Sequence, residues 1–149
     1  MITDNYIKIK MCEQAEEIQK DWKPKAGDYV QLNKNKQIYL VSSVEKSKDK
    51  KKVVFYTNII NGNDSWCYLE FFKDNFVYLP TQEQLQEMSG IPWWRFDKRC
   101  DGVRCCLLED PLNNIEIRTK EEAGICVVME KKYNKIWTGE KWEEVKTSE

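Results

Sequence analysis

The sequence contains no histidine in its 149 residues. Histidine most often serves as the general acid or base near neutral pH, and it completes many zinc sites. Glycine is also scarce, and the six glycines are scattered, so no glycine-rich phosphate loop is present. These absences disfavour hydrolytic, metal-dependent and nucleotide-dependent chemistry. We therefore expect a non-enzymatic protein with no cofactor.

An excess of positive charge and long apolar runs are also missing. The 24 basic and 25 acidic residues give a net charge of -1, so no global charge attracts nucleic acid or an anionic membrane surface. No apolar run approaches the length that spans a bilayer. The first residues, MITDNYIKIKMCEQ, lack the basic head and long apolar stretch of a secretory signal. We expect a cytoplasmic protein without a membrane partner.

The cysteines lack metal-site spacing. They are Cys12, Cys67, Cys100, Cys105, Cys106 and Cys126. Their even number suits disulfides, but without an export signal we expect six reduced thiols. No Cys-x-x-Cys occurs, and adjacent cysteines in a strand point to opposite faces, so we expect no metal. For Cys100, Cys105 and Cys106 the sequence indicates only packing; a cysteine-dependent enzyme stays open as an alternative.

Hydrophobic residues make up 41% of the chain and aromatic residues 12%, which is enough for a real core. We expect a single domain, 1–149, of α+β class. Its parts are an amino-terminal helix at about 8–22, a β-rich core at about 27–109 and a carboxy-terminal helix at about 120–138. The core is predicted to be a curved antiparallel sheet or small barrel of about five to seven strands.

The amino-terminal helix is predicted from apolar spacing. Ile7, Met11, Ala15, Ile18 and Trp22 follow at intervals of four, four, three and four, which places them on one helix face. The following proline at position 24 disfavours helical geometry just before it. We interpret this helix as a packing element.

Short runs of β-branched and aromatic residues separated by turn formers predict the strands. They cover 29–32, 37–44, 52–59, 66–72 and 75–80, with another at 103–109 that pairs with 93–96. The last two of the first five are expected to form a hairpin around Lys73 and Asp74.

The stretch VYLPTQEQLQEMSGIPWWRF predicts a strand followed by a short helix over 82–88. Thr81 and Gln84 have capping-box spacing, and Gly90 stands where a left-handed helix end is expected. The glutamines of this helix are expected to face solvent or a partner. Thr119 and Glu122 repeat the capping box before the carboxy-terminal helix, which Gly139 is expected to terminate.

Two adjacent tryptophans follow this helix. Pro92 favours extended geometry, in which Trp93 and Trp94 point to opposite faces. One indole would then enter the core. The other, together with Arg95, is our candidate protein-binding surface, because Trp and Arg are enriched at binding hot spots.

A lysine-rich segment provides the competing candidate. Its members are Lys46, Lys48, Lys50, Lys51 and Lys52. We interpret it as a solvated hairpin tip; the alternative is a nucleic-acid-binding module in which these lysines contact phosphates.

Three stretches, WKPKAGDYV, VYLPTQEQLQEM and MEKKYNKIWTGEKW, resemble a family of small bacteriophage and prophage proteins of gut Firmicutes. The resemblance covers most of the chain and is strongest at Leu79, Pro80, Gln82, Gln84, Leu85, Gln86, Glu87, Met88, Tyr133, Trp137, Gly139 and Trp142. It implies an accessory protein that acts inside the bacterial host by binding a host or phage protein. Inhibition of a host defence complex is one such activity.

Overall fold

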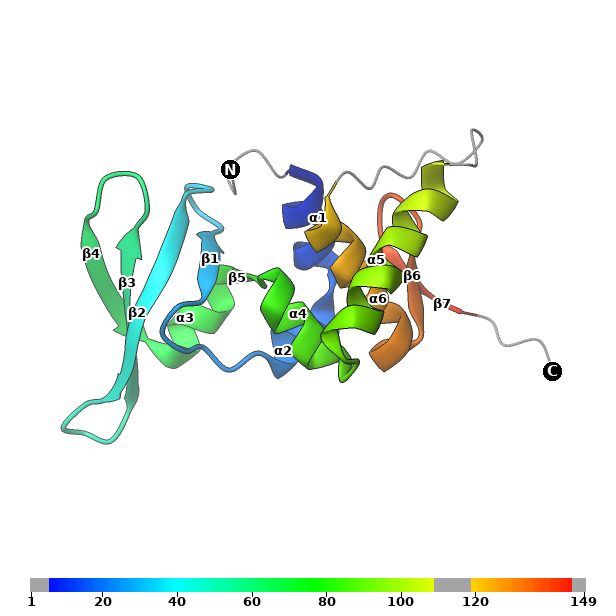
Figure 1. Ribbon diagram of the computed structural model, residues 1–149. Helices are drawn as coiled ribbons and strands as arrows, with labels where there is room; N and C mark the ends of the chain where they lie inside the picture. The colour runs from blue at the N-terminus through cyan, green and yellow to red at the C-terminus, as the bar shows by residue number, and fades with distance from the viewer. Residues whose placement is uncertain (1–5, 109–118, 146–149) are drawn as a thin grey trace. The chain divides into compact units, whose positions relative to one another are not determined.

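The computed structural model describes residues 6–108 and 119–145 (Figure 1). These residues divide into two compact units. Unit 1 contains residues 18–80, and unit 2 contains 6–17, 81–108 and 119–145. The single domain expected from chain length is not tested by this division and stays a prediction.

Unit 1 is built on a five-stranded antiparallel sheet in the order β4-β3-β2-β1-β5. The strands are β1 (Tyr29–Leu32), β2 (Ile38–Lys46), β3 (Lys52–Asn58), β4 (Asp64–Tyr68) and β5 (Phe76–Leu79). The pairing of β2 with β3 shifts register between Val41 and Ser43, a bulge that bends the strand. The α+β prediction is confirmed, but the sheet is open and not a barrel.

Helix α3 (Leu69–Asn75) replaces the hairpin predicted around Lys73 and Asp74, which was wrong. Apolar residues spaced by three give the reason. Phe72 is fully buried while Phe71 is 59% exposed, so the segment presents one helical face to the core. The ring of Phe72 stacks on Phe76 at 4.3 Å between centroids.

The amino-terminal helix is interrupted. It forms α1 (Tyr6–Gln14) and α2 (Glu16–Asp21) with a break at Ala15, where a continuous helix over about 8–22 was expected. Trp22 follows α2 and lies in the core of unit 1. Its indole stacks on Tyr78 at 4.8 Å and donates a hydrogen bond to Asp28 at 2.9 Å.

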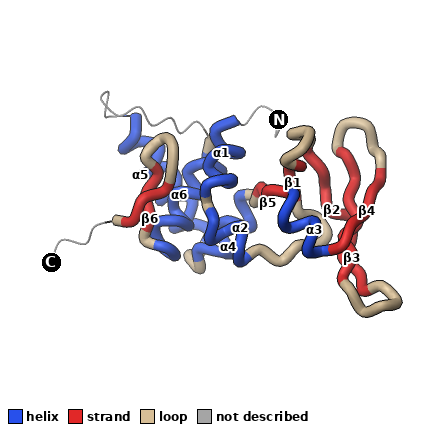
Figure 2. The backbone as a smooth tube through the Cα atoms, turned by 180° about the vertical axis from the view of Figure 1, so that it is seen from behind, coloured by secondary structure: helices blue, strands red, loops and turns tan. Residues whose placement is uncertain are grey.

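Unit 2 surrounds helix α6 (Lys120–Tyr133), which lies among α1, α4 (Gln82–Ser89) and α5 (Trp93–Leu108), as Figure 2 shows from behind. Every residue of α6 from Glu122 to Met129 is buried, as expected for a helix with neighbours on all sides. The capping boxes at Thr81 and Thr119 are both present. Gly90 has the expected left-handed conformation.

The strands predicted at 93–96 and 103–109 are wrong, because residues 93–108 form α5. Phe96 and Cys100, four residues apart, are both fully buried, which is helical spacing. The expected β-rich core at 27–109 is therefore interrupted by α3, α4 and α5.

The carboxy-terminal helix is shorter than predicted. It ends at Tyr133, and Asn134 adopts the left-handed conformation at φ 56°. A hairpin of β6 (Lys135–Trp137) and β7 (Trp142–Glu144) follows, with Gly139 in its turn. Trp137 and Trp142 pack together at 5.1 Å, so these rings belong to a hairpin and not to the helix.

Candidate binding surface on helix α5

The paired tryptophans are the first two residues of α5, and both of their rings are exposed. Trp93 is 50% and Trp94 64% accessible, while Phe96 fills the core position with no exposure. Consecutive residues in a helix are about 100° apart, not on opposite faces as in a strand. The expectation that one indole enters the core was therefore wrong.

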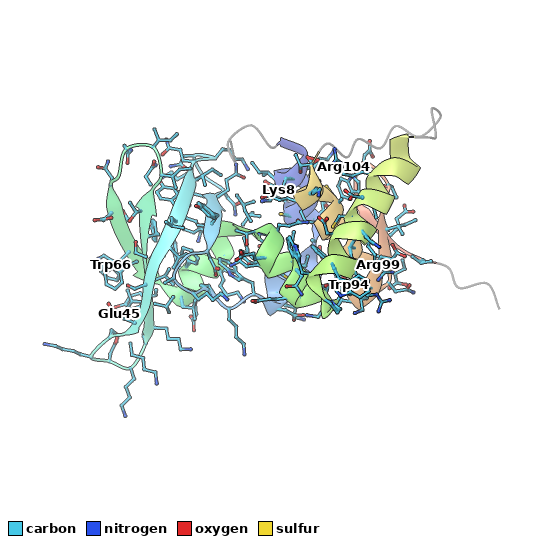
Figure 3. The ribbon with its side chains drawn as sticks, in the orientation of Figure 1. Lys8, Glu45, Trp66, Trp94, Arg99 and Arg104 are labelled. Atoms are coloured by element: carbon cyan, nitrogen blue, oxygen red, sulfur yellow. The ribbon has the colours of Figure 1, made fainter. Side chains whose placement is uncertain are left out.

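Helical spacing joins Trp94 and Arg95 to two further cations. Trp94, Lys98 and Gly102 form one row of residues four apart, and Arg95, Arg99 and Val103 form the adjacent row. The ammonium of Lys98 lies 6.0 Å from the Trp94 ring centroid. Figure 3 shows Trp94 and Arg99 on the same stretch of α5. We call Trp94, Arg95, Lys98 and Arg99 the α5 surface.

Trp93 lies outside these rows, about one third of a turn from Trp94. Its ring packs against Phe96 at 6.2 Å. Asp97, four residues after Trp93, and Asp101, seven residues after Trp94, pair with Lys120 at 3.0 Å and 3.8 Å. The hydrogen bond to Asp97 raises the pKa of Lys120.

Both rows of the α5 surface lead into a pocket of about 380 Å³. Its walls come from α5, α6 and β6, and its lining residues are Arg99, Gly102, Val103, Cys126, Val127, Glu130, Ile136 and Trp137. Most of these side chains are apolar, and Glu130 is the single carboxylate among them. The pocket is therefore suited to an apolar group entering beside the guanidinium of Arg99.

The positive charges of the α5 surface come from Arg95, Lys98 and Arg99. Within the described residues Arg95, Lys98 and Arg99 form no ion pair, in contrast to Lys120. Sequence reasoning found Trp94 and Arg95 but missed Lys98, Arg99 and the pocket. The missed signal is the spacing of four from Trp94 to Lys98 and from Arg95 to Arg99, which a strand interpretation cannot use.

The glutamines of α4 serve the fold. Gln84 completes the capping box, Gln86 donates to the carbonyl of Ile91 at 2.6 Å, and Gln82 approaches the Cys100 sulfur at 3.5 Å. The expectation that these amides face solvent or a partner was wrong for these three contacts. The capping box stabilises the start of the helix.

The thiols that the structure describes are unbridged. Burial raises the pKa of Cys12 and of Cys126 to about 12, and it also raises the pKa of Cys67 and Cys100. Cys105 and Cys106 lie outside the described side chains. Within the described residues no cluster of histidine, cysteine and carboxylate side chains could hold a metal ion.

The five lysines of the alternative site are exposed on the hairpin between β2 and β3. Lys46, Lys48, Lys50, Lys51 and Lys52 all belong to unit 1, whereas the α5 surface belongs to unit 2. None of the helices in the described part of the chain is long and apolar enough to cross a membrane.

Comparison of the chain with protein-family models, curated proteins and solved structures finds no match in any of the three.

Proposed function

We propose that this chain is a non-enzymatic accessory protein that acts by binding another protein through the α5 surface. One observation carries the proposal: two helical rows lead from an exposed indole and three cations, which have no ion-pair partner among the described residues, into an apolar pocket. Trp and Arg are the residue types most enriched at binding hot spots. The exposed indole of Trp94 also releases water when a partner covers it.

The charge of the surface indicates the chemistry of the partner. Arg95, Lys98 and Arg99 would attract carboxylates, which raises the association rate and selects acidic partners. The pocket would hold an apolar side chain of the same segment. The expected ligand is therefore an acidic protein segment with an apolar anchor.

The resemblance to bacteriophage and prophage proteins supports a setting for this binding. It implies that the protein acts in the cytoplasm of a bacterial host cell, with a host or phage protein as its partner. Inhibition of a host defence complex is one outcome that such binding would produce.

The thiol environments support binding over catalysis by cysteine. A cysteine nucleophile acts as its thiolate, which a lowered pKa favours. The four described thiols have raised pKa values instead, because burial disfavours the charged form. They therefore stay protonated near neutral pH.

Affinity capture followed by measured binding tests the proposal. The full chain captures partners from host lysate, mass spectrometry identifies them, and titration calorimetry then measures each purified candidate. We expect Trp94→Ala and Arg99→Glu each to weaken binding at least about tenfold, as hot-spot residues do.

Matched variants separate this surface from general effects. Trp93→Ala removes an exposed indole from a different side of α5, and Lys132→Glu reverses an exposed charge on α6. Both should bind like the wild type. If Trp93→Ala weakens binding as much as Trp94→Ala, the partner does not recognise the α5 surface as proposed.

A further inference from the structure

Unit 1 carries a second exposed aromatic group, distinct from the α5 surface. Trp66 and Tyr68 alternate along β4, so they share one face of the sheet, and they lie opposite Phe55 and Val53 of β3. Trp66 is 55% and Tyr68 43% exposed, and their rings meet edge to face at 5.7 Å. Figure 3 shows Trp66 at this strand.

Phe71 extends this group from the neighbouring helix. It is 59% exposed at the start of α3, directly after β4. We call Trp66, Tyr68 and Phe71 the aromatic patch. About half of the surface of each of these three residues stays in water, and that half contributes nothing to folding through burial. Their exposure is explained if a ligand covers them.

We call residues 46–52, which join β2 to β3, the lysine hairpin, and this segment reaches the aromatic patch through Lys51. The Lys51 ammonium lies 5.6 Å from the Tyr68 ring centroid. Lys50, Lys51 and Lys52 line one hollow of about 610 Å³ together with Tyr68, Leu69, Glu70 and Phe71. The hairpin turn is well ordered by hydrogen bonds from Ser47 N to Lys51 O at 2.8 Å and from Lys50 N to Ser47 O at 2.9 Å.

The charges of unit 1 favour an anionic ligand. Residues 18–80 contain eleven lysines and seven carboxylates, a formal charge of +4, whereas the whole chain carries -1 and the remainder therefore -5. The carboxylates on the neighbouring segments are Glu45, Asp49, Glu70 and Asp64, and Asp64 accepts a hydrogen bond from the Thr57 hydroxyl at 2.6 Å. The Ser47 hydroxyl donates a hydrogen bond to Asp49 and lowers its pKa, so this carboxylate stays charged and offsets one of the five lysines of the hairpin.

Aromatic rings next to lysines are the combination of groups that binds single-stranded nucleic acid. Unpaired bases stack on aromatic side chains while lysines follow the phosphates, and this combination needs no sequence-specific contact. A duplex keeps its base faces stacked inside, so it would meet the lysines alone. An acidic protein could pair with the lysines, but it has no base faces to stack on the rings. We propose that the aromatic patch and the lysine hairpin together bind single-stranded DNA or RNA.

Fluorescence anisotropy of the full chain with labelled oligothymidylate of about 15 nucleotides tests the proposal, since single-strand sites cover about 4–16 nucleotides. Binding at low salt should quench tryptophan emission. Trp66→Ala and Tyr68→Ala should each weaken the affinity for the oligonucleotide about tenfold. Replacing Lys50, Lys51 and Lys52 by alanine should also make the slope of log affinity against log salt shallower by about 2.

Control variants make the result specific. A triple alanine variant at Lys23, Lys25 and Lys34 removes the same charge from exposed positions elsewhere in unit 1 and should largely retain binding. Trp66→Phe keeps a ring and should also bind, and Trp94→Ala should bind like the wild type because it alters only the α5 surface. Equal affinity for duplex and single strand, or unchanged binding by the folded Trp66→Ala variant, overturns the proposal.

Discussion

The side-chain amide of Gln19 forms two hydrogen bonds with the backbone of Tyr78. Its Nε2 donates to the Tyr78 carbonyl at 3.0 Å, and the Tyr78 N–H donates to its Oε1 at 2.8 Å. Tyr78 belongs to β5, which pairs with β1 and ends the sheet. The amide thus occupies the place of a further strand and protects an edge that would otherwise be open to pairing.

Replacing Gln19 by alanine should leave both backbone groups of Tyr78 without these partners. We expect the free energy of unfolding to fall by about 1–3 kcal/mol, the cost of unsatisfied buried polar groups. Urea denaturation measures this, and amide hydrogen exchange at Tyr78 should accelerate. Gln14→Ala at an exposed position of α1 is the control and should change stability by less than about 0.5 kcal/mol. Equal stability of the two variants contradicts this role for Gln19.

The sequence was most informative where local chemistry decides the structure. The capping boxes at Thr81 and Thr119 and the left-handed Gly90 were predicted correctly, because each depends on residues three to nine positions apart. The strands of unit 1 before β4 were also located within two residues of their observed ends.

Prediction failed where a short apolar run fits either a helix or a strand. At the start of α5 the proline at position 92 favoured extended geometry, but the burial of Phe96 and Cys100 against α6 selects a helix. Because of that error, the helical spacing that places Lys98 next to Trp94 and Arg99 next to Arg95 was also missed. The pocket needs β6 to pack beside α5 and α6 after the chain has turned at Asn134. Local sequence does not specify that these three elements lie together.

Gly124 allows close packing around α6. A Cβ at this position would lie 2.7 Å from Gln82 Oε1, 3.1 Å from Leu85 Cδ1 and 3.2 Å from Phe96 Cζ. Gly124→Ala should therefore lower the free energy of unfolding by about 1–3 kcal/mol through overpacking, despite the higher helix propensity of alanine.

Gly102 provides the matched control for thermal unfolding. It also lies within a helix, but a Cβ there would meet nothing within 4 Å. Gly102→Ala should raise stability by about 0.4–1 kcal/mol, because alanine restricts the unfolded chain. A Gly124→Ala variant that gains stability like Gly102→Ala contradicts the close packing described here.

Cys12 should make the fold sensitive to alkaline pH. Burial is the main cause that raises its pKa from 9.0 to about 12, with Glu121 and Glu13 adding and Lys8 opposing. The folded state holds the proton more tightly than the unfolded chain, so this contribution is complete below pH 9.0 and is lost as the pH rises towards about 12. Within that window it falls by about 1.4 kcal/mol per pH unit.

Urea denaturation at several pH values compares the wild type with Cys12→Ala. Because other groups titrate in both proteins, the difference between the two slopes isolates Cys12. We expect parallel behaviour below pH 9.0 and a shallower loss of stability for Cys12→Ala above it. Parallel curves throughout the alkaline range would show that the thiol is not buried in this way.

The two exposed tryptophans and the buried phenylalanine of α5 should contribute very different amounts to the stability of the protein. Trp93 and Trp94 keep half or more of their surface in water, whereas Phe96 is fully buried. Phe96→Ala should lower the free energy of unfolding by about 3–5 kcal/mol, because it leaves a cavity in the core. Trp93→Ala and Trp94→Ala should each lower the free energy of unfolding by less than about 1 kcal/mol, because these side chains bury little apolar area. Differential scanning calorimetry measures all three against the wild type. A Trp94→Ala variant that unfolds as readily as Phe96→Ala would place this indole in the core and remove it from the proposed binding surface.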